Sequence, residues 1–253
     1  MLQSLKRARL IWPTALTIAG LAVLIGLGTW QLQRKQWKDQ LIAKIAARVV
    51  TSPVPLSEAQ RSWLFGGDIE YLRVTARGRL HESKERYLYA PAKSGLGWHV
   101  YAPLEWAPAQ VVWINRGFVP DARKDPASRP EGQLRGEVEV TGLVRVPHGP
   151  GLFTPANDVA HNLWYWPDVA AMQSSAFAGT DVRASSFWID ADAQPEPPGG
   201  LPRGGVTRLD LPNRHLEYAL TWYGLALTLV GVYGAFAASR LRPPGSPGDP
   251  RPD

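Results

Sequence analysis

Two long apolar segments lie near the two ends of the chain. Residues 10–32 carry no charged side chain, and a helix needs roughly 20 apolar residues to cross about 30 Å of hydrocarbon. A second uncharged stretch covers residues 218–238. The pattern predicts transmembrane helices at residues 10–32 and 214–238. Residues 33–48 continue with apolar side chains at helical spacing, which predicts either an extension of the first span or a separate helix at the membrane surface.

Between the spans the pattern changes to short apolar or alternating stretches separated by turn residues. These predict strands at residues 71–80, 86–90, 98–104, 111–115, 137–146, 162–166 and 186–189. One or two helical turns are expected at residues 167–173, and loops at residues 120–136 and 194–205. We therefore expect a membrane protein of the α+β class, whose residues 33–213 form a mainly antiparallel β sheet or a barrel-like domain.

Two spans return the chain to the side of the membrane on which it starts. The domain at residues 33–213 then lies opposite the N-terminal residues 1–9 and the Pro- and Gly-rich tail at residues 239–253. Basic side chains flank the outer ends of both spans, at Lys6, Arg7, Arg9, Arg240 and Arg242. Since Lys and Arg favour the cytoplasmic side, we expect cytoplasmic termini and an extracytoplasmic domain.

A cleaved signal peptide is the alternative interpretation of the first apolar segment. Its apolar run is long for a signal peptide, Trp12 and Trp30 bracket it as interfacial anchors, and no clear Ala-x-Ala cleavage site follows. These features favour an uncleaved anchor.

Small side chains recur at helical spacing along one face of each predicted span. Such faces let two helix backbones approach closely in a membrane. They comprise Ala15, Ala19, Ala22 and Gly26 on the first span, and Gly224, Thr228, Gly231 and Ala235 on the second. We expect the spans to pack together along these faces.

The charge and composition exclude several classes of protein. The net charge is +6, yet residues 33–213 hold 21 Lys or Arg against 19 Asp or Glu, so the excess lies mostly at the chain ends. No basic stripe with interleaved aromatic side chains occurs, and we expect no nucleic-acid binding. The absence of Cys excludes disulfides, thiol catalysis and haem attachment through Cys. The 11 Trp residues suit a chain with membrane boundaries, where indole is favoured.

Recognisable enzyme motifs are also missing. The sequence contains no Gly-x-Ser-x-Gly elbow, phosphate-binding loop, dinucleotide fingerprint or His-Glu-x-x-His helix. None of the five His has a second His or a carboxylate at metal-ligand spacing on a common face, and we expect four of them to be surface or sheet residues, namely His81, His99, His148 and His161. With no Cys and two Met, a copper chaperone is not favoured. We expect no enzyme, because a membrane-tethered enzyme would need paired acids or a nucleophile in a pocket.

His215 differs from the other His because it lies at the mouth of the second predicted span. On a helix it shares a face with Tyr218 and Trp222. The first span leaves the membrane on the same side, so His215 should meet Trp30, Gln31, Arg34 and Arg214 at one boundary. A haem needs an axial nitrogen, apolar walls and cations for its propionates. The alternative is that His215 only caps its helix or anchors it among lipid headgroups.

Four segments of the chain together resemble a known family. They read GLGTWQLQRKQWKDQLI at residues 26–42, WINRGFVP at residues 113–120, NLWYWPDVAAM at residues 162–172 and PNRHLEYALTWYGLA at residues 212–226. In order, in spacing and in the two terminal spans they are similar to the surfeit locus protein family, the Surf-one or Shy-one type assembly factors of cytochrome c oxidase. The sequence departs from the usual family pattern at Phe118, where many members have Trp, and at Arg214, where a second Asn is usual.

The resemblance implies a non-enzymatic membrane factor that assists placement of haem a in subunit I of a haem–copper oxidase. It implies that His215 is an axial ligand of the haem iron. We expect Trp30 and Trp222 to cover the macrocycle, and Arg34 and Arg214 to bind the propionates. The expected partners are oxidase subunit I, the haem a synthase and membrane lipid, and a homo-oligomer is compatible with the sequence. The N-terminal segment lacks a Ser-rich transit sequence, which favours a bacterial inner membrane and a periplasmic central domain.

Further motif residues are Gln31, Tyr218 and the run Asn115, Arg116 and Gly117. We expect this run to shape a turn of the domain that docks on the oxidase. A purely structural turn is the alternative. A rival function for the whole chain is that of a permanent accessory subunit of the oxidase, which holds no cofactor of its own.

Overall fold

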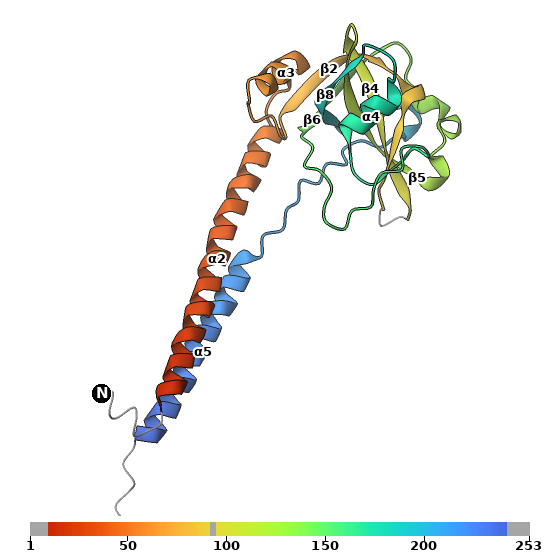
Figure 1. The fold of residues 1–253 in the computed structure, drawn as a ribbon. Coiled ribbons are helices and arrows are strands. Elements are labelled where there is room, and N and C mark those ends of the chain that lie inside the picture. The colour runs from red at the N-terminus through yellow and green to blue at the C-terminus, as the bar shows by residue number, and fades with distance from the viewer. Residues whose placement is uncertain (1–9, 92–94, 242–253) are drawn as a thin grey trace, which may run out of the picture. The chain divides into compact units, whose positions relative to one another are not determined.

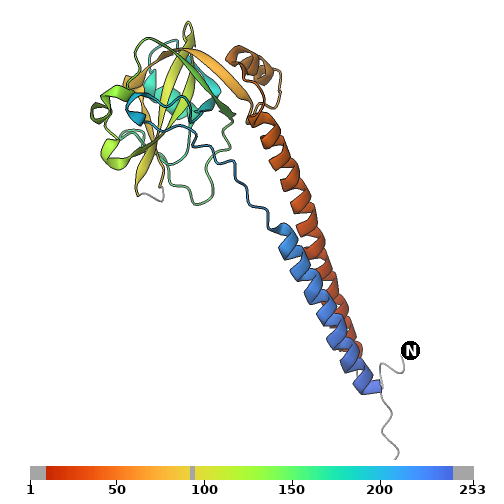
Figure 2. The same ribbon diagram turned by 180° about the vertical axis from the view of Figure 1, so that it is seen from behind.

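The computed structural model describes residues 10–91 and 95–241, and the chain forms two compact units. One unit comprises the chain up to Ala43 and from Asp210 onward, and its described part is mainly a pair of helices. The other unit, Lys44–Leu209, is rich in β strands. Figures 1 and 2 show both units from opposite sides. Two terminal helices flanking a β domain are thus confirmed.

Both terminal helices are long and apolar enough to cross a membrane. Helix α2 (Ile11–Val49) has 39 residues, or about 58 Å at 1.5 Å per residue, so it extends well beyond a single span. Residues 33–48 therefore extend the first span, and the alternative prediction of a separate helix at the membrane surface is wrong. Helix α5 (His215–Leu241) has 27 residues. Large apolar side chains such as Leu16 (71% exposed) and Leu227 (74% exposed) point away from the pair, as expected where lipid surrounds it.

The two helices lie side by side (Figures 1 and 2). Large side chains of α5 pack onto small residues of α2. The ring of Tyr223 covers Gly28, where an added Cβ would lie 2.8 Å from two ring atoms. Leu229 covers Gly20 in the same way, since a Cβ added at Gly20 would lie 3.1 Å from Cδ2 of Leu229. The Tyr223 hydroxyl also forms a hydrogen bond with Thr29, at 3.1 Å between the two oxygens.

The prediction that the small faces pack against each other is wrong. The small residues in question are exposed: Ala15, Ala19, Ala22, Gly26, Gly224, Thr228, Gly231 and Ala235. We attribute the arrangement to two of the three Tyr hydroxyls of α5, those of Tyr223 and Tyr233, which need a partner in a medium that offers none. Thr29 supplies it to Tyr223, and Thr14 supplies it to Tyr233.

The second unit is built on a closed barrel. Its strands are β1 (Val54–Pro55), β2 (Arg73–Leu80), β3 (Arg86–Tyr89), β4 (Gly97–Ala107), β5 (Gln110–Pro120), β6 (Glu137–Arg145), β7 (Leu163–Trp164) and β8 (Arg183–Ala191). They form one sheet in the order β1-β2-β6-β8-β5-β4-β3-β7, and an additional pairing of β2 with β4 closes the five middle strands. Within the barrel only β5 and β8 are parallel neighbours. The expectation of a mainly antiparallel, barrel-like domain is confirmed.

Short helices cover the barrel. The helix predicted at residues 167–173 is α4 (Val169–Ala176), and its Met172 packs in one cluster with Trp113 and Trp164 on the outer face of the sheet. Helix α3 (Leu56–Leu64) adds Leu56 and Ala59 to the barrel core. The sequence pattern does not predict this helix. The remaining helical turns are η1 (Glu82–Lys84), η2 (Asp121–Arg123), η3 (Pro126–Ser128), η4 (Pro130–Gly132) and η5 (Pro198–Gly200).

Candidate functional site

His215 is the first residue of α5, and its ring meets α2 at Gln31. The distance between Nδ1 of His215 and Oε1 of Gln31 is 2.7 Å. Both residues are half-buried. Within residues 10–91 and 95–241, no other hydrogen bond reaches the His215 ring. His215 and Gln31 therefore meet at one level of the helix pair, as the sequence predicts.

Asn213 ties the start of α5 to α2. Its Nδ2 donates to Oδ1 of Asp39 at 2.8 Å and to the main-chain oxygen of Lys35 at 3.4 Å. Its Oδ1 accepts from the main-chain N–H of His215 at 3.4 Å, and Lys38 Nζ donates to the main-chain oxygen of the preceding proline at 2.5 Å. We call this set the polar joint. It consists of Gln31, Lys35, Lys38, Asp39, Pro212, Asn213 and His215.

Four members of the polar joint are not singled out by the sequence pattern, namely Lys35, Lys38, Asp39 and Pro212. A signal for two of them exists, because Gln31, Lys35 and Asp39 follow one another at intervals of four and so share a helix face. Three polar residues on one face just beyond an apolar span indicate a partner on the neighbouring helix.

The aromatic residues expected around a haem lie near His215 in sequence or at the same helix level. Trp30 precedes Gln31 and is 54% exposed, whereas Trp222 is half-buried two turns along α5. Tyr218, one turn after His215, is 53% exposed. Trp30 and Tyr218 therefore present ring surface to lipid or to a planar ligand.

The two arginines expected at the propionates each contact a side chain three residues further along the chain. The guanidinium of Arg34 lies 3.9 Å from the ring centroid of Trp37. Arg214 donates to Oε2 of Glu217 through Nε at 3.0 Å and through a terminal nitrogen at 2.8 Å. Both arginines are exposed. An anionic ligand would have to displace Glu217 from Arg214.

The donor set fits a haem better than a bare metal ion. Among the described residues, no group of three or more His, Cys, Asp or Glu side chains could hold a metal ion. A haem iron already has four porphyrin nitrogens and needs only an axial ligand. An imidazole that is hydrogen-bonded through Nδ1 keeps Nε2 for a metal. His215 meets this requirement.

Asn115, Arg116 and Gly117 belong to the other unit, where they lie in β5. Asn115 is 2% exposed, and its Nδ2 donates to Oδ1 of Asp190 at 2.8 Å. Its Oδ1 accepts from the N–H of Gly117 at 3.1 Å. The backbone of Gly117 has a φ of +114°, which favours glycine. Asn115 and Gly117 thus fix a bend inside the barrel wall.

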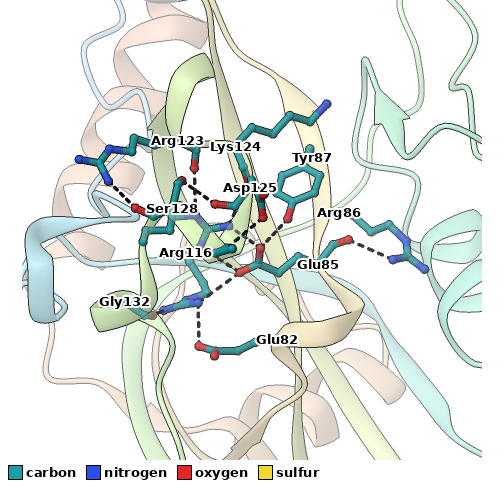
Figure 3. Close-up of polar contacts among 12 residues, drawn as sticks. Glu82, Glu85, Arg86, Tyr87, Arg116, Arg123, Lys124, Asp125, Ser128 and Gly132 are labelled. Atoms are coloured by element: carbon teal, nitrogen blue, oxygen red, sulfur yellow. Dashed lines mark hydrogen bonds and ion pairs between the residues drawn. The ribbon is translucent and has the colours of Figure 1, made fainter.

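Arg116 forms the centre of a buried ion-pair network (Figure 3). It donates to Oε1 of Glu82 at 2.9 Å, to Oε1 of Glu85 at 3.4 Å and to the main-chain oxygen of Gly132 at 2.5 Å. Glu85 is also paired with Arg129. The network ties the loop after β5 to the barrel. Arg116 itself is 7% exposed, so the geometry supports the structural alternative for this motif over direct contact with a partner.

Burial shapes the acid–base properties of this network. It raises the pKa of Glu82 despite the nearby arginines, and it lowers the pKa of Arg116 despite Glu82 and Glu85. It also raises the pKa of Tyr87, whose hydroxyl donates to Oε2 of Glu85 at 2.8 Å. Removing one partner would leave a buried charge without compensation, which is strongly destabilising.

Replacing Gly117 by Ala is expected to destabilise the β domain by about 2–5 kcal/mol, through backbone strain and overpacking. An added Cβ would lie 1.9 Å from the main-chain oxygen of Arg203. Gly136→Ala is the matched control, because Gly136 also has a positive φ, of +85°, but no atom lies within 4 Å of its added Cβ. Thermal unfolding followed by tryptophan fluorescence measures both variants. Equal losses of stability would contradict a special role for the bend at Gly117.

The chain is similar to members of one protein family over most of its length. A model of the SURF1 family matches residues 18–227, which include the polar joint and the whole barrel. The mouse (Mus musculus) Surfeit locus protein 1 is 38% identical over 220 residues, covering 81% of this chain and 69% of the mouse protein. The human (Homo sapiens) Surfeit locus protein 1 is 38% identical over 218 residues, covering 79% and 69%. A SURF1-like protein of Drosophila melanogaster is 33% identical over 223 residues, covering 81% and 71%.

Proposed function

The chain belongs to the SURF1 family, and from this membership we propose that it is an assembly factor of a haem–copper cytochrome c oxidase. In this proposal it holds haem a on the way into oxidase subunit I and catalyses no reaction of its own. Haem a is the cargo of this protein, and it supplies the finished oxidase with redox-active iron.

The observation that carries the proposal is the hydrogen bond between His215 and Gln31. It holds the imidazole where α2 and α5 meet, and it leaves Nε2 available as an axial nitrogen. Cargo held through a single axial histidine can be released more readily than cargo held by two. That property suits a carrier that must pass its haem on.

The surroundings of His215 supply the other contacts that a haem requires. Trp30 and Trp222 would cover the apolar macrocycle from α2 and α5. Arg34 and Arg214 would bind the propionates after they leave Trp37 and Glu217. Guanidinium groups pair well with carboxylates, and this exchange of partners at an exposed site carries little net cost.

We further propose that the chain lies in a bacterial inner membrane, with both termini in the cytoplasm and Lys44–Leu209 in the periplasm. The orientation is supported by the placement of Lys and Arg at the outer ends of the spans. In this arrangement the haem a synthase and oxidase subunit I meet the helix pair from within the membrane. Lipid covers the remaining apolar surface.

Deletion of the gene is expected to lower the haem a content of subunit I severalfold while subunit I is still made, because insertion loses its carrier. Pyridine haemochrome spectra of the purified subunit measure this, and the restored intact chain is the control. An unchanged haem content would contradict the carrier role. Stoichiometric presence of the protein in the mature oxidase would favour the rival role of a permanent subunit, whereas presence in precursors alone supports an assembly factor.

A further inference from the structure

We propose that Gln31 is a positioning residue that holds His215 in the tautomer with its proton on Nδ1 and a lone pair on Nε2. The inference deepens the proposed function and rests on it for the identity of the ligand. The state of the ring itself is a property of the chain alone. It can be tested without haem.

Two atoms face each other across the helix pair, Oε1 of Gln31 and Nδ1 of His215. Oε1 of Gln31 carries no hydrogen and can only accept. With Oε1 of Gln31 facing the ring at 2.7 Å, the contact is a hydrogen bond when Nδ1 of His215 donates. A neutral imidazole has one N–H, so Nε2 then carries the lone pair that a metal requires. In the other tautomer Nδ1 would present a lone pair to Oε1, and the Gln31 amide would have to turn over so that its Nε2 donates to the ring.

The polar joint explains why this pairing is specific. Asn213 is fixed to Asp39 and to the main chain at Lys35, and it lies only two residues before His215. Its own Oδ1 accepts from the N–H of His215. These contacts hold the His215 backbone against α2 independently of the ring. Gln31, two turns before Asp39 on the same face, is then the side chain that the ring meets.

The nature of the acceptor also sets the strength of the iron ligand. A hydrogen bond from Nδ1–H raises the basicity of the opposite ring nitrogen, and a carboxylate acceptor raises it more than an amide does. Gln31 therefore gives His215 an intermediate strength as a ligand. The replacement Gln31→Glu should strengthen the ligand, and Gln31→Leu should weaken it and release the ring.

The first experiment uses the full-length protein without haem, labelled with nitrogen-15 histidine and studied by NMR in lipid nanodiscs at mildly alkaline pH. The His215 signals are identified by their loss in His215→Ala. We expect Nδ1 protonated and Nε2 unprotonated in the unaltered chain, and a mixture of tautomers in Gln31→Leu. Gln33→Leu, at an exposed position on α2, should leave the ring unchanged. A proton on Nε2 in the unaltered chain, or an identical ring state in Gln31→Leu, would overturn the proposal.

The second experiment measures the reduction potential of haem a bound to the purified protein. A stronger axial ligand favours the ferric state, so the potential should fall in Gln31→Glu and rise in Gln31→Leu relative to the unaltered chain. A purely structural role for Gln31 would lower the haem content and leave the potential of the bound haem unmoved. That outcome would contradict the inference.

The two proposals can fail separately. If His215→Ala keeps its haem while NMR finds the expected tautomer, the ligand role of His215 is wrong and the positioning by Gln31 remains. If His215→Ala loses its haem while the Gln31 variants leave both tautomer and potential unchanged, the carrier role remains and the positioning role is wrong.

Discussion

His215→Ala is expected to lower the haem a content of the purified protein at least about tenfold, since loss of an axial bond costs more than the 1.4 kcal/mol that corresponds to this factor. The protein is isolated from cells that make haem A, and haem is measured per chain by its Soret absorbance. The substitution removes a half-buried ring at the start of α5 and leaves Asn213 joined to Asp39. The helix pair should therefore persist in the variant.

The matched control for this prediction is His161→Ala. The side chain of His161 is 81% exposed and contacts Asp158 in a loop of the other unit. Its loss should leave the haem content unchanged. Equal haem in the His215 variant and in the unaltered chain would contradict the ligand assignment, and a parallel loss in the His161 variant would indicate general damage to the protein.

Gly28→Leu is expected to have the second large effect, because it forces α2 and α5 apart. A Cβ at Gly28 already lies 2.8 Å from ring atoms of Tyr223, and a Leu side chain needs more room still. Overpacking of this kind costs about 1–3 kcal/mol, which weakens helix pairing by about 5- to 150-fold. Haem binding should fall as well, because His215 would lose contact with Gln31.

Gly26→Leu is the control for the same substitution on a face of α2 that meets nothing, since no atom lies within 4 Å of its added Cβ. The chain contains no Cys, so spin labels can be attached at Cys introduced for Val23 and Leu227, both exposed. Electron paramagnetic resonance should find a longer and broader distance between the labels in the Gly28 variant only. The same distance in both variants would show that the helices do not pack as described.

Much of the fold could be predicted because its signals are local. The length and lack of charge of the two apolar segments predict the spans, and alternating apolar and polar residues between turn residues predict most strands. Closure of the barrel could not be predicted, since it depends on the pairing of Arg79 with Glu105 and of Leu80 with Leu104 at the ends of two strands. Helix α3 was missed because it has only nine residues and buries just Leu56 and Ala59.

Part of the candidate site could likewise be predicted from the sequence, and part could not. Two antiparallel spans must bring the start of one to the end of the other, and this reasoning predicts that His215 lies at the level of Trp30, Gln31 and Arg34. The rotation of each helix about its axis could not be predicted, because it depends on where Tyr223 and Tyr233 find hydroxyl partners. The small-residue faces were misjudged for that reason. The pairing of Glu85 with Arg129 could not be predicted either, since 44 positions separate the two residues along the chain.

The identity of the atom bound to the haem iron decides whether His215 is the ligand. The protein is produced with nitrogen-15 histidine and haem A at natural abundance, and the ferric state is studied by electron–nuclear double resonance. We predict one histidine nitrogen coupled to the iron, which disappears in His215→Ala and persists in His161→Ala. An iron that shows no coupling to histidine, or a coupling that survives the loss of His215, would contradict the account.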